Sequence, residues 1–282
     1  LTINAIAKDK RGQFIDPFNG IDDIRKKILR HVSSAFVEDP IRVLRIARFS
    51  ARFHQFKIHP TTQSILKKIV KNKEIEAVAS ERVWREISVG LLEKKSHLMF
   101  DVLHQCGALQ VLIPEINYVK NKNYIKRSLE YANKFKYSLD IKAAIFFMHV
   151  YASKTSVKEI AKIYTRLSVP NSVRKLTEKL ADNMTDLREF KKLKPRQILD
   201  LIYRMDLFRN PDVLIDIIKI LEAYNEGQAK KYKSVGSTLK ALQKYLKHLN
   251  KLNLGLISQN KTNLDIKSTI YEARLHVLKK FI

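Results

Sequence analysis

Apolar residues recur at helical spacing from about Gly20 to the end of this chain, and this spacing constrains its fold more than any other feature. In segment after segment they return every three or four residues, as expected of amphipathic helices. Glycine and proline, which most often interrupt helices, number only seven each among 282 residues. The pattern predicts a mainly α fold, with helices at roughly 21–29, 39–54, 61–71, 81–93, 96–106, 122–136, 140–152, 155–167, 171–189, 195–205, 211–224, 236–251 and 264–281.

The first twenty residues have a different pattern. Thr2 to Ala7 alternates and is partly β-branched, Asp9 to Gly12 has turn-forming residues, and Gln13 to Ile15 resumes an extended pattern. This order predicts a short β-hairpin. Because the chain opens on Leu1 inside the first predicted strand, we expect it to be a fragment whose N-terminal part is absent.

The sequence is strongly basic, which limits the partners that we expect. Its 54 Lys and Arg residues against 28 Asp and Glu residues give a formal net charge of +26. Such an excess is typical of proteins that bind a polyanion, either nucleic acid or an acidic membrane. No apolar run approaches the roughly 18 residues that span a bilayer, and the start has no signal-peptide pattern. We therefore expect a soluble, cytoplasmic protein without a membrane-spanning segment.

The lysines of the predicted helix 236–251 form a stripe. They are spaced four, three and four residues apart, and leucines occupy the other side of the helix. A solvated surface is the ordinary explanation of such a stripe. However, it lacks the interspersed carboxylates that usually neutralise a surface helix, and RNA phosphates would supply the missing anions. The candidate RNA-binding residues are Lys240, Lys244, Lys247 and Lys251.

A second basic helix is predicted to start at Asp39 and Pro40, which suit its N-cap and its first helical position. Arg42, Arg45 and Arg48 then occupy one side of the helix. Residues 42–52 include four arginines and no lysine. Arginine differs from lysine in its planar fork of donors, which suits bidentate contacts with phosphate or a base edge. The side that we expect to pack inward carries Val43, Leu44, Ile46 and Ala47.

Two interpretations of this helix remain open. An ion-paired surface would suit Arg42, which has Glu38 and Asp39 one turn earlier, but Arg45 and Arg48 have no carboxylate at that spacing. Alternatively, the side chains bind a nucleotide. Asp39 and Arg42 would then place an acceptor and a donor on adjacent turns and imitate the edge of a template base, although a capping role alone would also explain Asp39.

Several segments resemble, in order and at familiar spacing, the motifs of class II tRNA nucleotidyltransferases, the CCA-adding enzymes. Bacterial poly(A) polymerases share most of these motifs. The resemblance implies the last part of a nucleotidyltransferase head at 1–34, a helical neck at 35–116, and a helical body and tail at 117–282. The matching segments are Leu1–Ala5, Asp16–Gly20, Glu38–Phe49, Glu81–Glu86, Cys106–Ile116 and Arg166–Arg174.

The resemblance also implies an activity, partners and residue roles. The enzyme would add CCA to tRNA 3′ ends from CTP and ATP, with Mg²⁺ held by the head. Asp39 and Arg42 would pair with the incoming C or A, while Arg45 and Arg48 would hold the nucleotide. Body and tail would grip tRNA. Poly(A) polymerase activity and a non-catalytic helical RNA-binding remnant are the alternatives, and the sequence does not indicate the oligomeric state.

Catalytic and metal-binding residues are not expected within the chain. The Gly-Gly and Asp-x-Asp motifs of the family's head occur nowhere in it. The adjacent Asp22 and Asp23 would diverge by about 100° on a helix and suit a shared Mg²⁺ poorly. We therefore expect the chain to be inactive alone. His149 and the single Cys106 are expected to be packing residues, since neither lies at metal-ligand spacing.

The segment that begins at Ser80 is expected to brace the neck without chemistry of its own. Its charged residues are spaced for pairs between Glu81 and Arg85 and between Arg82 and Glu86, four residues apart on one helix. Ser80 is expected to cap that helix.

Overall fold

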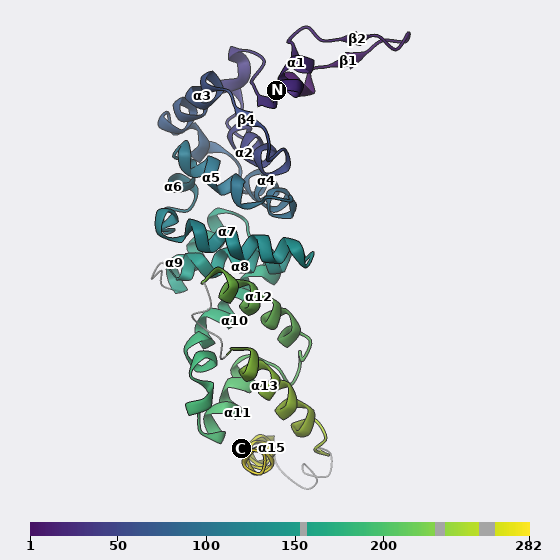
Figure 1. Cartoon of the computed structure of the whole chain (residues 1–282). Helices are drawn as coiled ribbons and strands as arrows, with labels where there is room; N and C mark the ends of the chain where they lie inside the picture. The colour runs from purple at the N-terminus through teal and green to yellow at the C-terminus, as the bar shows by residue number, and fades with distance from the viewer. Residues whose placement is uncertain (153–156, 229–234, 254–262) are drawn as a thin grey trace. The chain divides into compact units, whose positions relative to one another are not determined.

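The computed structural model describes residues 1–152, 157–228, 235–253 and 263–282 (Figure 1). Helices dominate these residues, and each described strand is only two residues long, which confirms the predicted mainly α fold. The chain forms two compact units, Leu1–Arg174 and Lys175–Ile282. The described helices include none that is both long and apolar enough to cross a lipid bilayer.

The first unit begins with short elements and continues as packed helices. Its elements are η1 (Thr2–Asn4), β1 (Ala7–Lys8), β2 (Phe14–Ile15), α1 (Gly20–Lys26), β3 (Ile28–Leu29), η2 (Ser34–Glu38), α2 (Arg42–Arg52), β4 (Lys57–Ile58), α3 (Pro60–Lys71), η3 (Glu74–Ala77), α4 (Ser80–Leu92), α5 (His97–Gln105), α6 (Ala108–Leu112), α7 (Tyr118–Lys134), α8 (Leu139–Tyr151) and α9 (Val157–Arg166). The next helix, α10 (Asn171–Arg188), contains the boundary between the units.

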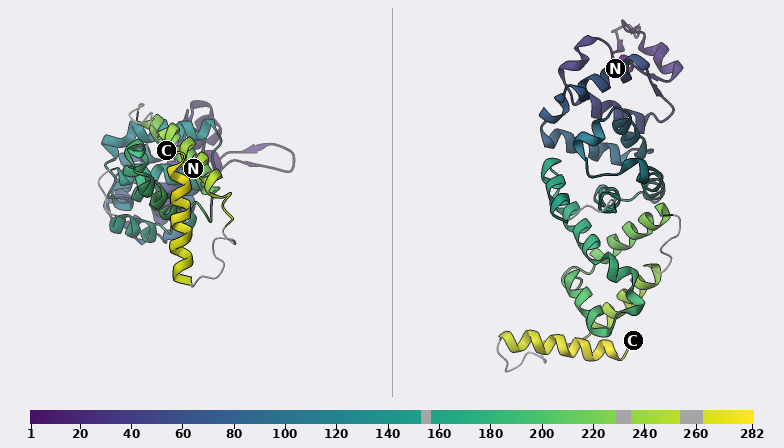
Figure 2. Two further views of the ribbon diagram at one scale, coloured as in Figure 1. Left: turned by 90° about the horizontal axis from the view of Figure 1, so that it is seen from below. Right: turned by 90° about the vertical axis from the view of Figure 1, so that its left-hand side faces the viewer.

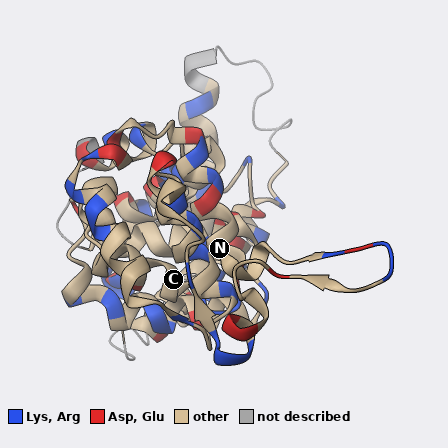
Figure 3. Ribbon diagram, turned by 90° about the horizontal axis from the view of Figure 1, so that it is seen from above, with Lys and Arg blue, Asp and Glu red and all other residues tan. Residues whose placement is uncertain are grey.

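The predicted hairpin is present but shorter than expected. β1 and β2 are antiparallel, with Ala7 opposite Ile15, and the hairpin extends away from the helices of its unit (Figures 1 and 2). Its basic tip is visible in Figure 3. The strand predicted from Thr2 is wrong at its start, because Thr2–Asn4 is a 3₁₀ helix. The Thr2 amide donates to the Arg30 carbonyl and its hydroxyl donates to Asp23, at 3.0 and 2.7 Å, which draws these residues toward α1.

The helix predicted at 21–29 ends earlier, at Lys26. Lys27 adopts a left-handed conformation with φ of 56°, and the following residues form β3. β3 pairs in parallel with β4, with Ile28 opposite Lys57. Two-residue strands leave almost no periodicity in a sequence, so this pairing was not predicted.

Helix α2 lies in the core of the first unit, where it packs against α4 and α5. The side predicted to face inward is confirmed, since its apolar residues are almost completely buried. The helix begins at Arg42, not at Asp39, and the Asp39 side chain makes no cap bond. The buried residues of the predicted side are Val43, Leu44, Ile46 and Ala47.

Two segments that carry the family resemblance meet in the first unit. Arg166, at the end of α9, donates to the Leu112 carbonyl at 2.9 Å and forms an ion pair with Glu115 at 2.7 Å. The guanidinium of Arg166 therefore fixes the loop after α6 to α9.

Gly107, with φ of +85°, separates α5 from α6, a short helix that was not predicted.

The second unit contains η4 (Phe190–Lys192), α11 (Pro195–Arg204), α12 (Val213–Gly227), α13 (Val235–Leu249) and α15 (Asn263–Lys279). α13 packs against α12 and α15, and α15 also packs against α11 (Figure 2). Between α11 and α15 the rings of Tyr203 and Tyr271 stack at 5.8 Å. The predicted head, neck, and body with tail, at 1–34, 35–116 and 117–282, are divisions by function. These boundaries stay a prediction.

Candidate functional site

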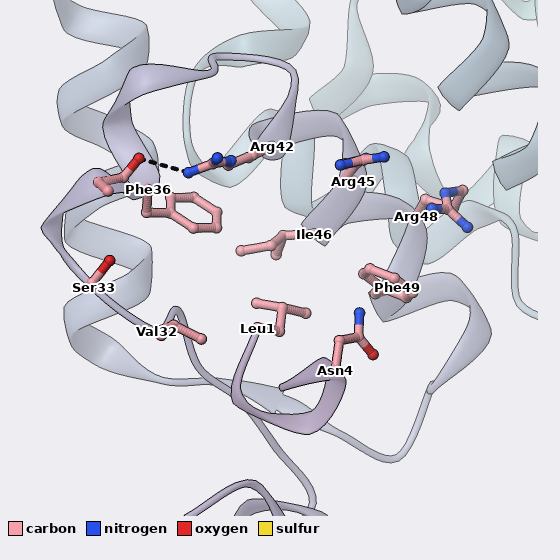
Figure 4. A pocket seen from close by; sticks show the side chains of 11 residues that line it. Leu1, Asn4, Val32, Ser33, Phe36, Arg42, Arg45, Ile46, Arg48 and Phe49 are labelled. Atoms are coloured by element: carbon pink, nitrogen blue, oxygen red, sulfur yellow. Dashed lines mark hydrogen bonds between the residues drawn. The ribbon is translucent and has the colours of Figure 1, made fainter. Parts of the chain in front are cut away.

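A pocket of about 460 Å³ opens beside α2 in the first unit. Arg42, Arg45 and Arg48 stand along one side of it, and Leu1 and Asn4 lie opposite (Figure 4). The predicted spacing of the arginines thus brings all three to one cavity. The other lining residues are Val32, Ser33, Ala35, Phe36, Ile46 and Phe49.

The first arginine is held by the chain segment before its own helix. Nη1 of Arg42 donates to the Ala35 carbonyl at 2.6 Å, and its guanidinium lies 5.6 Å from the centre of the Phe36 ring. On an ordinary surface helix, Arg42 would pair with Glu38 or Asp39. Among the described residues it forms neither of these ion pairs. Arg42 is therefore positioned at the pocket by η2, with further donors of its guanidinium still available.

The other two arginines share a carboxylate from a different helix. Nε of Arg48 donates to Oε2 of Glu86 at 2.6 Å, and Nε of Arg45 approaches Oε1 at 3.4 Å. The side chains of Arg48 and Glu86 are only 16% and 12% exposed, whereas that of Arg45 is 54% exposed. The guanidinium of Arg48 also lies 4.7 Å from the centre of the Phe49 ring. Arg48 is thus fixed at the site, and Arg45 is freer to contact a ligand.

The i,i+4 pairs predicted along α4 are wrong. Glu86 binds arginines of α2, and Glu81 accepts hydrogen bonds from Ser80 and Ser168 at 3.3 and 3.4 Å. Ser80 is the first residue of the helix and not its cap. The partners from outside α4 are Arg45 and Arg48 for Glu86, and Ser168 for Glu81. They outweigh the predicted pairs because an exposed i,i+4 pair contributes only about 0.3–0.5 kcal/mol.

Asp39 lies outside the pocket lining. Both of its carboxylate oxygens accept hydrogen bonds from Nη2 of Arg82, at 3.2 and 3.1 Å. The pair is partly exposed, 30% for Asp39 and 54% for Arg82. Asp39 and Arg42 are therefore neighbours in sequence whose side chains are held by different partners, α4 for the carboxylate and η2 for the guanidinium.

A second cavity, of about 380 Å³, shares Arg45 and Arg48 with the first. Arg82 and Arg85, which were predicted only to brace the neck, also line it. The signal that could have identified them is their spacing, since residues 82, 85, 86 and 89 occupy one side of a helix. The full lining is Ile41, Arg45, Arg48, Arg82, Arg85, Glu86 and Val89.

The lysine stripe of the second unit has the predicted orientation. Its four lysines are exposed, and Leu239, Leu242, Leu246 and Leu249 are buried. Binding of RNA by these residues stays a prediction. The stripe consists of Lys240, Lys244, Lys247 and Lys251.

The donor set of the described residues does not fit a Mg²⁺ site. They contain no group of three or more His, Cys, Asp or Glu side chains that could hold a metal ion. Asp22 pairs with Lys26 at 2.7 Å, while Asp23 accepts hydrogen bonds from Thr2 and Arg30. Burial alone would raise the pKa of Asp23, but the hydrogen bonds from Arg30 and Thr2 lower it overall.

His149 and Cys106 are packing residues, as predicted. His149 is completely buried, and its Nε2 lies 2.9 Å from the Ser128 hydroxyl. Burial lowers the pKa of His149 to about 3, so the ring is neutral at physiological pH. Cys106 is also buried, which raises the pKa of its thiol.

Comparison with known proteins shows which family and which fold the chain shares. The family model described as "Probable RNA and SrmB- binding site of polymerase A" matches residues 55–120. The "Multifunctional CCA protein" of Methylobacillus flagellatus is 30% identical over 99% of the chain and 75% of that relative. The protein of the same name from Herminiimonas arsenicoxydans is 34% identical over 81% of the chain and 62% of its own length. The chain thus spans between 62% and 75% of these relatives.

Solved structures show the same fold. A CCA-adding enzyme with CTP superimposes with a TM-score of 0.71 and 20% identity, over 98% of this chain and 66% of that enzyme. The Thermotoga maritima CCA-adding enzyme complexed with tRNA gives a TM-score of 0.68 and 21% identity, over 99% of this chain and 70% of that enzyme.

Proposed function

The chain belongs to the family of CCA-adding enzymes, and from that premise we propose that it is the nucleotide-selecting and RNA-binding part of an enzyme that adds CCA to tRNA 3′ ends from CTP and ATP. The single observation that carries the proposal is the pocket beside α2, where three arginines of one helix line one cavity. The names of the relatives and of the solved structures support it further.

In this proposal the arginines divide the work of holding a nucleotide. Arg42, held by the Ala35 carbonyl, offers its remaining donors to the base. Asp39, which Arg82 holds outside the pocket lining, offers the remaining acceptor capacity of its carboxylate. Arg48, fixed by Glu86, and Arg45, which is more exposed, contact the rest of the nucleotide. Guanidinium forks suit this task because they bind oxygen pairs of phosphate or a base edge in a defined plane.

The apolar lining gives the base a surface to stack on. Phe36, Ile46 and Phe49 lie in the same pocket as the arginines. Contact with an apolar or aromatic surface stabilises a base without distinguishing its identity. Selection between C and A would therefore depend on the polar groups of Asp39 and Arg42.

In this proposal, Mg²⁺ is bound outside the described residues. Since the described residues do not fit a metal site, we propose that carboxylates outside them would hold the ion. The described residues bind and orient the nucleotide and the RNA.

The proposal is tested with the protein as its gene encodes it, on a tRNA transcript that lacks the CCA end. The Arg42→Ala variant should lose both rate and the choice between CTP and ATP. Arg52→Ala is the matched control, because Arg52 is an exposed arginine on the same helix outside the pocket lining. Unchanged nucleotide choice and rate in Arg42→Ala would show that Arg42 does not read the base.

The same assay separates the alternatives. A CCA-adding enzyme should stop after three nucleotides, whereas a poly(A) polymerase should extend the primer with A alone. A protein that binds the transcript but incorporates neither nucleotide would favour a helical RNA-binding remnant.

A further inference from the structure

The second cavity carries an excess of positive charge that nucleotide binding does not explain. The pocket beside α2, which we propose for the nucleotide, is called the nucleotide pocket below. Arg45, Arg48, Arg82 and Arg85 line it together with one carboxylate, Glu86. Arg45 and Arg48 come from α2, whereas Arg82 and Arg85 come from α4. The packing of these two helices thus brings four guanidinium groups to one small cavity.

The carboxylates nearby neutralise only part of this charge. Glu86 binds Arg48 and Arg45, and Asp39 binds Arg82. Arg85 is exposed, and its guanidinium forms no ion pair or hydrogen bond with any described residue. Among the described residues, these four guanidinium groups therefore have two carboxylate partners, of which only Glu86 lines the cavity. Like charges held this close repel one another unless an anion binds between them, and phosphate fits the geometry of guanidinium forks.

The position of Arg82 and Arg85 indicates which phosphate would bind. Both residues lie within 55–120, the segment matched by the family model for an RNA-binding site, whereas Arg42, Arg45 and Arg48 precede it. Arg45 and Arg48 line both cavities, so the second cavity adjoins the nucleotide pocket. An RNA whose 3′ end reaches the nucleotide must pass beside that pocket.

We propose that Arg82 and Arg85, together with Arg45 and Arg48, form a phosphate site for the backbone of the RNA strand whose 3′ end is extended. This inference rests on the proposed function for the identity of the RNA. Arg45 and Arg48 then contact both substrates, the nucleotide in the first cavity and the RNA in the second. They thereby hold the RNA 3′ end and the nucleotide next to each other.

Arg85 is the residue to test, because Arg82 also holds Asp39 and the arginines of α2 also line the nucleotide pocket. The protein as its gene encodes it is titrated with a labelled tRNA transcript lacking CCA, between about 50 and 200 mM salt. Arg85→Ala should weaken RNA binding about fivefold or more and reduce the slope of log affinity against log salt by about one. Its KM for CTP and ATP should stay within about twofold of the unmodified protein.

Two further variants keep the test specific. Arg85→Lys retains the charge without the fork and should bind RNA with intermediate affinity. Arg127→Ala removes another exposed arginine, from α7 and outside both cavities, and should bind RNA within about twofold of the unmodified protein. Circular dichroism melting checks that each variant is folded.

The inference is overturned if Arg85→Ala binds the transcript with unchanged affinity and salt slope. It is also overturned if Arg85→Ala raises the KM for CTP and ATP while RNA affinity stays the same, which would assign the cavity to the triphosphate. RNA binding that depends on Arg85, in a protein that does not add CCA, would refute the proposed function and support the phosphate site.

Discussion

The Glu86 carboxylate on α4 accepts a hydrogen bond from Nε of Arg48 on α2, at 2.6 Å, and both side chains are mostly buried. The same carboxylate approaches Arg45 at 3.4 Å. One acidic residue thus positions two of the three arginines that line the pocket, and it comes from a segment 38 residues further along the chain than Arg48.

Replacement of Glu86 by Gln should destabilise the protein and weaken nucleotide binding. Arg48 would lose its anionic partner in a place that water reaches poorly, so we expect the free energy of unfolding to fall by about 1–3 kcal/mol. The KM for CTP and ATP should rise. Glu76→Gln, at an exposed position, should change stability by less than about 0.5 kcal/mol. Urea denaturation measures both variants, and equal midpoints would refute a positioning role for Glu86.

Replacement of Arg82 by Gln should affect nucleotide choice more than stability. The Asp39–Arg82 pair is partly exposed, so its loss should cost less than about 1 kcal/mol. The freed Asp39 carboxylate should no longer hold one orientation, and discrimination between CTP and ATP should fall about threefold to tenfold. If Arg82 acts through Asp39, the double variant with Asp39→Asn should discriminate no worse than Asp39→Asn alone. Additive losses would contradict that coupling.

The buried His149 should make stability sensitive to acid. Its pKa is about 3 in the folded protein, below the ordinary value of 6.5, so the unfolded chain takes up the proton first. The free energy of unfolding should therefore fall as pH drops from about 6.5 toward 3, by up to about 1.4 kcal/mol per pH unit. In His149→Gln this slope should be smaller. His54→Gln, at an exposed position, should retain the original slope, and an unchanged slope in His149→Gln would contradict the assignment.

Two glycines should respond to alanine in opposite directions. A Cβ at Gly90 on α4 would collide with the sulfur of the buried Met99, so Gly90→Ala should lower the free energy of unfolding by about 1–3 kcal/mol. A Cβ at Gly236 on α13 would meet nothing within 4 Å. Gly236→Ala should therefore be neutral or stabilise the helix by up to about 1 kcal/mol. Urea denaturation of both variants measures these changes. A stabilised Gly90→Ala or a destabilised Gly236→Ala would contradict the prediction.

Local patterns in the sequence predicted most of the helices and their buried sides. The spacing of Arg42, Arg45 and Arg48 placed them on one side of a helix, and the leucines of α13 are buried opposite its exposed lysines. These predictions held because amphipathic periodicity acts over one or two turns and is written in adjacent residues.

At the candidate site, tertiary structure alone decided which charged groups meet. The sequence indicated a pair between Arg82 and Glu86, one turn apart, but Arg82 binds Asp39 and Glu86 binds Arg45 and Arg48. The 3₁₀ helix at Thr2–Asn4 and the pairing of β3 with β4 likewise depend on partners more than twenty residues away. Such contacts form only when the packing of apolar faces brings distant segments together. The spacing of neighbouring residues therefore does not predict them.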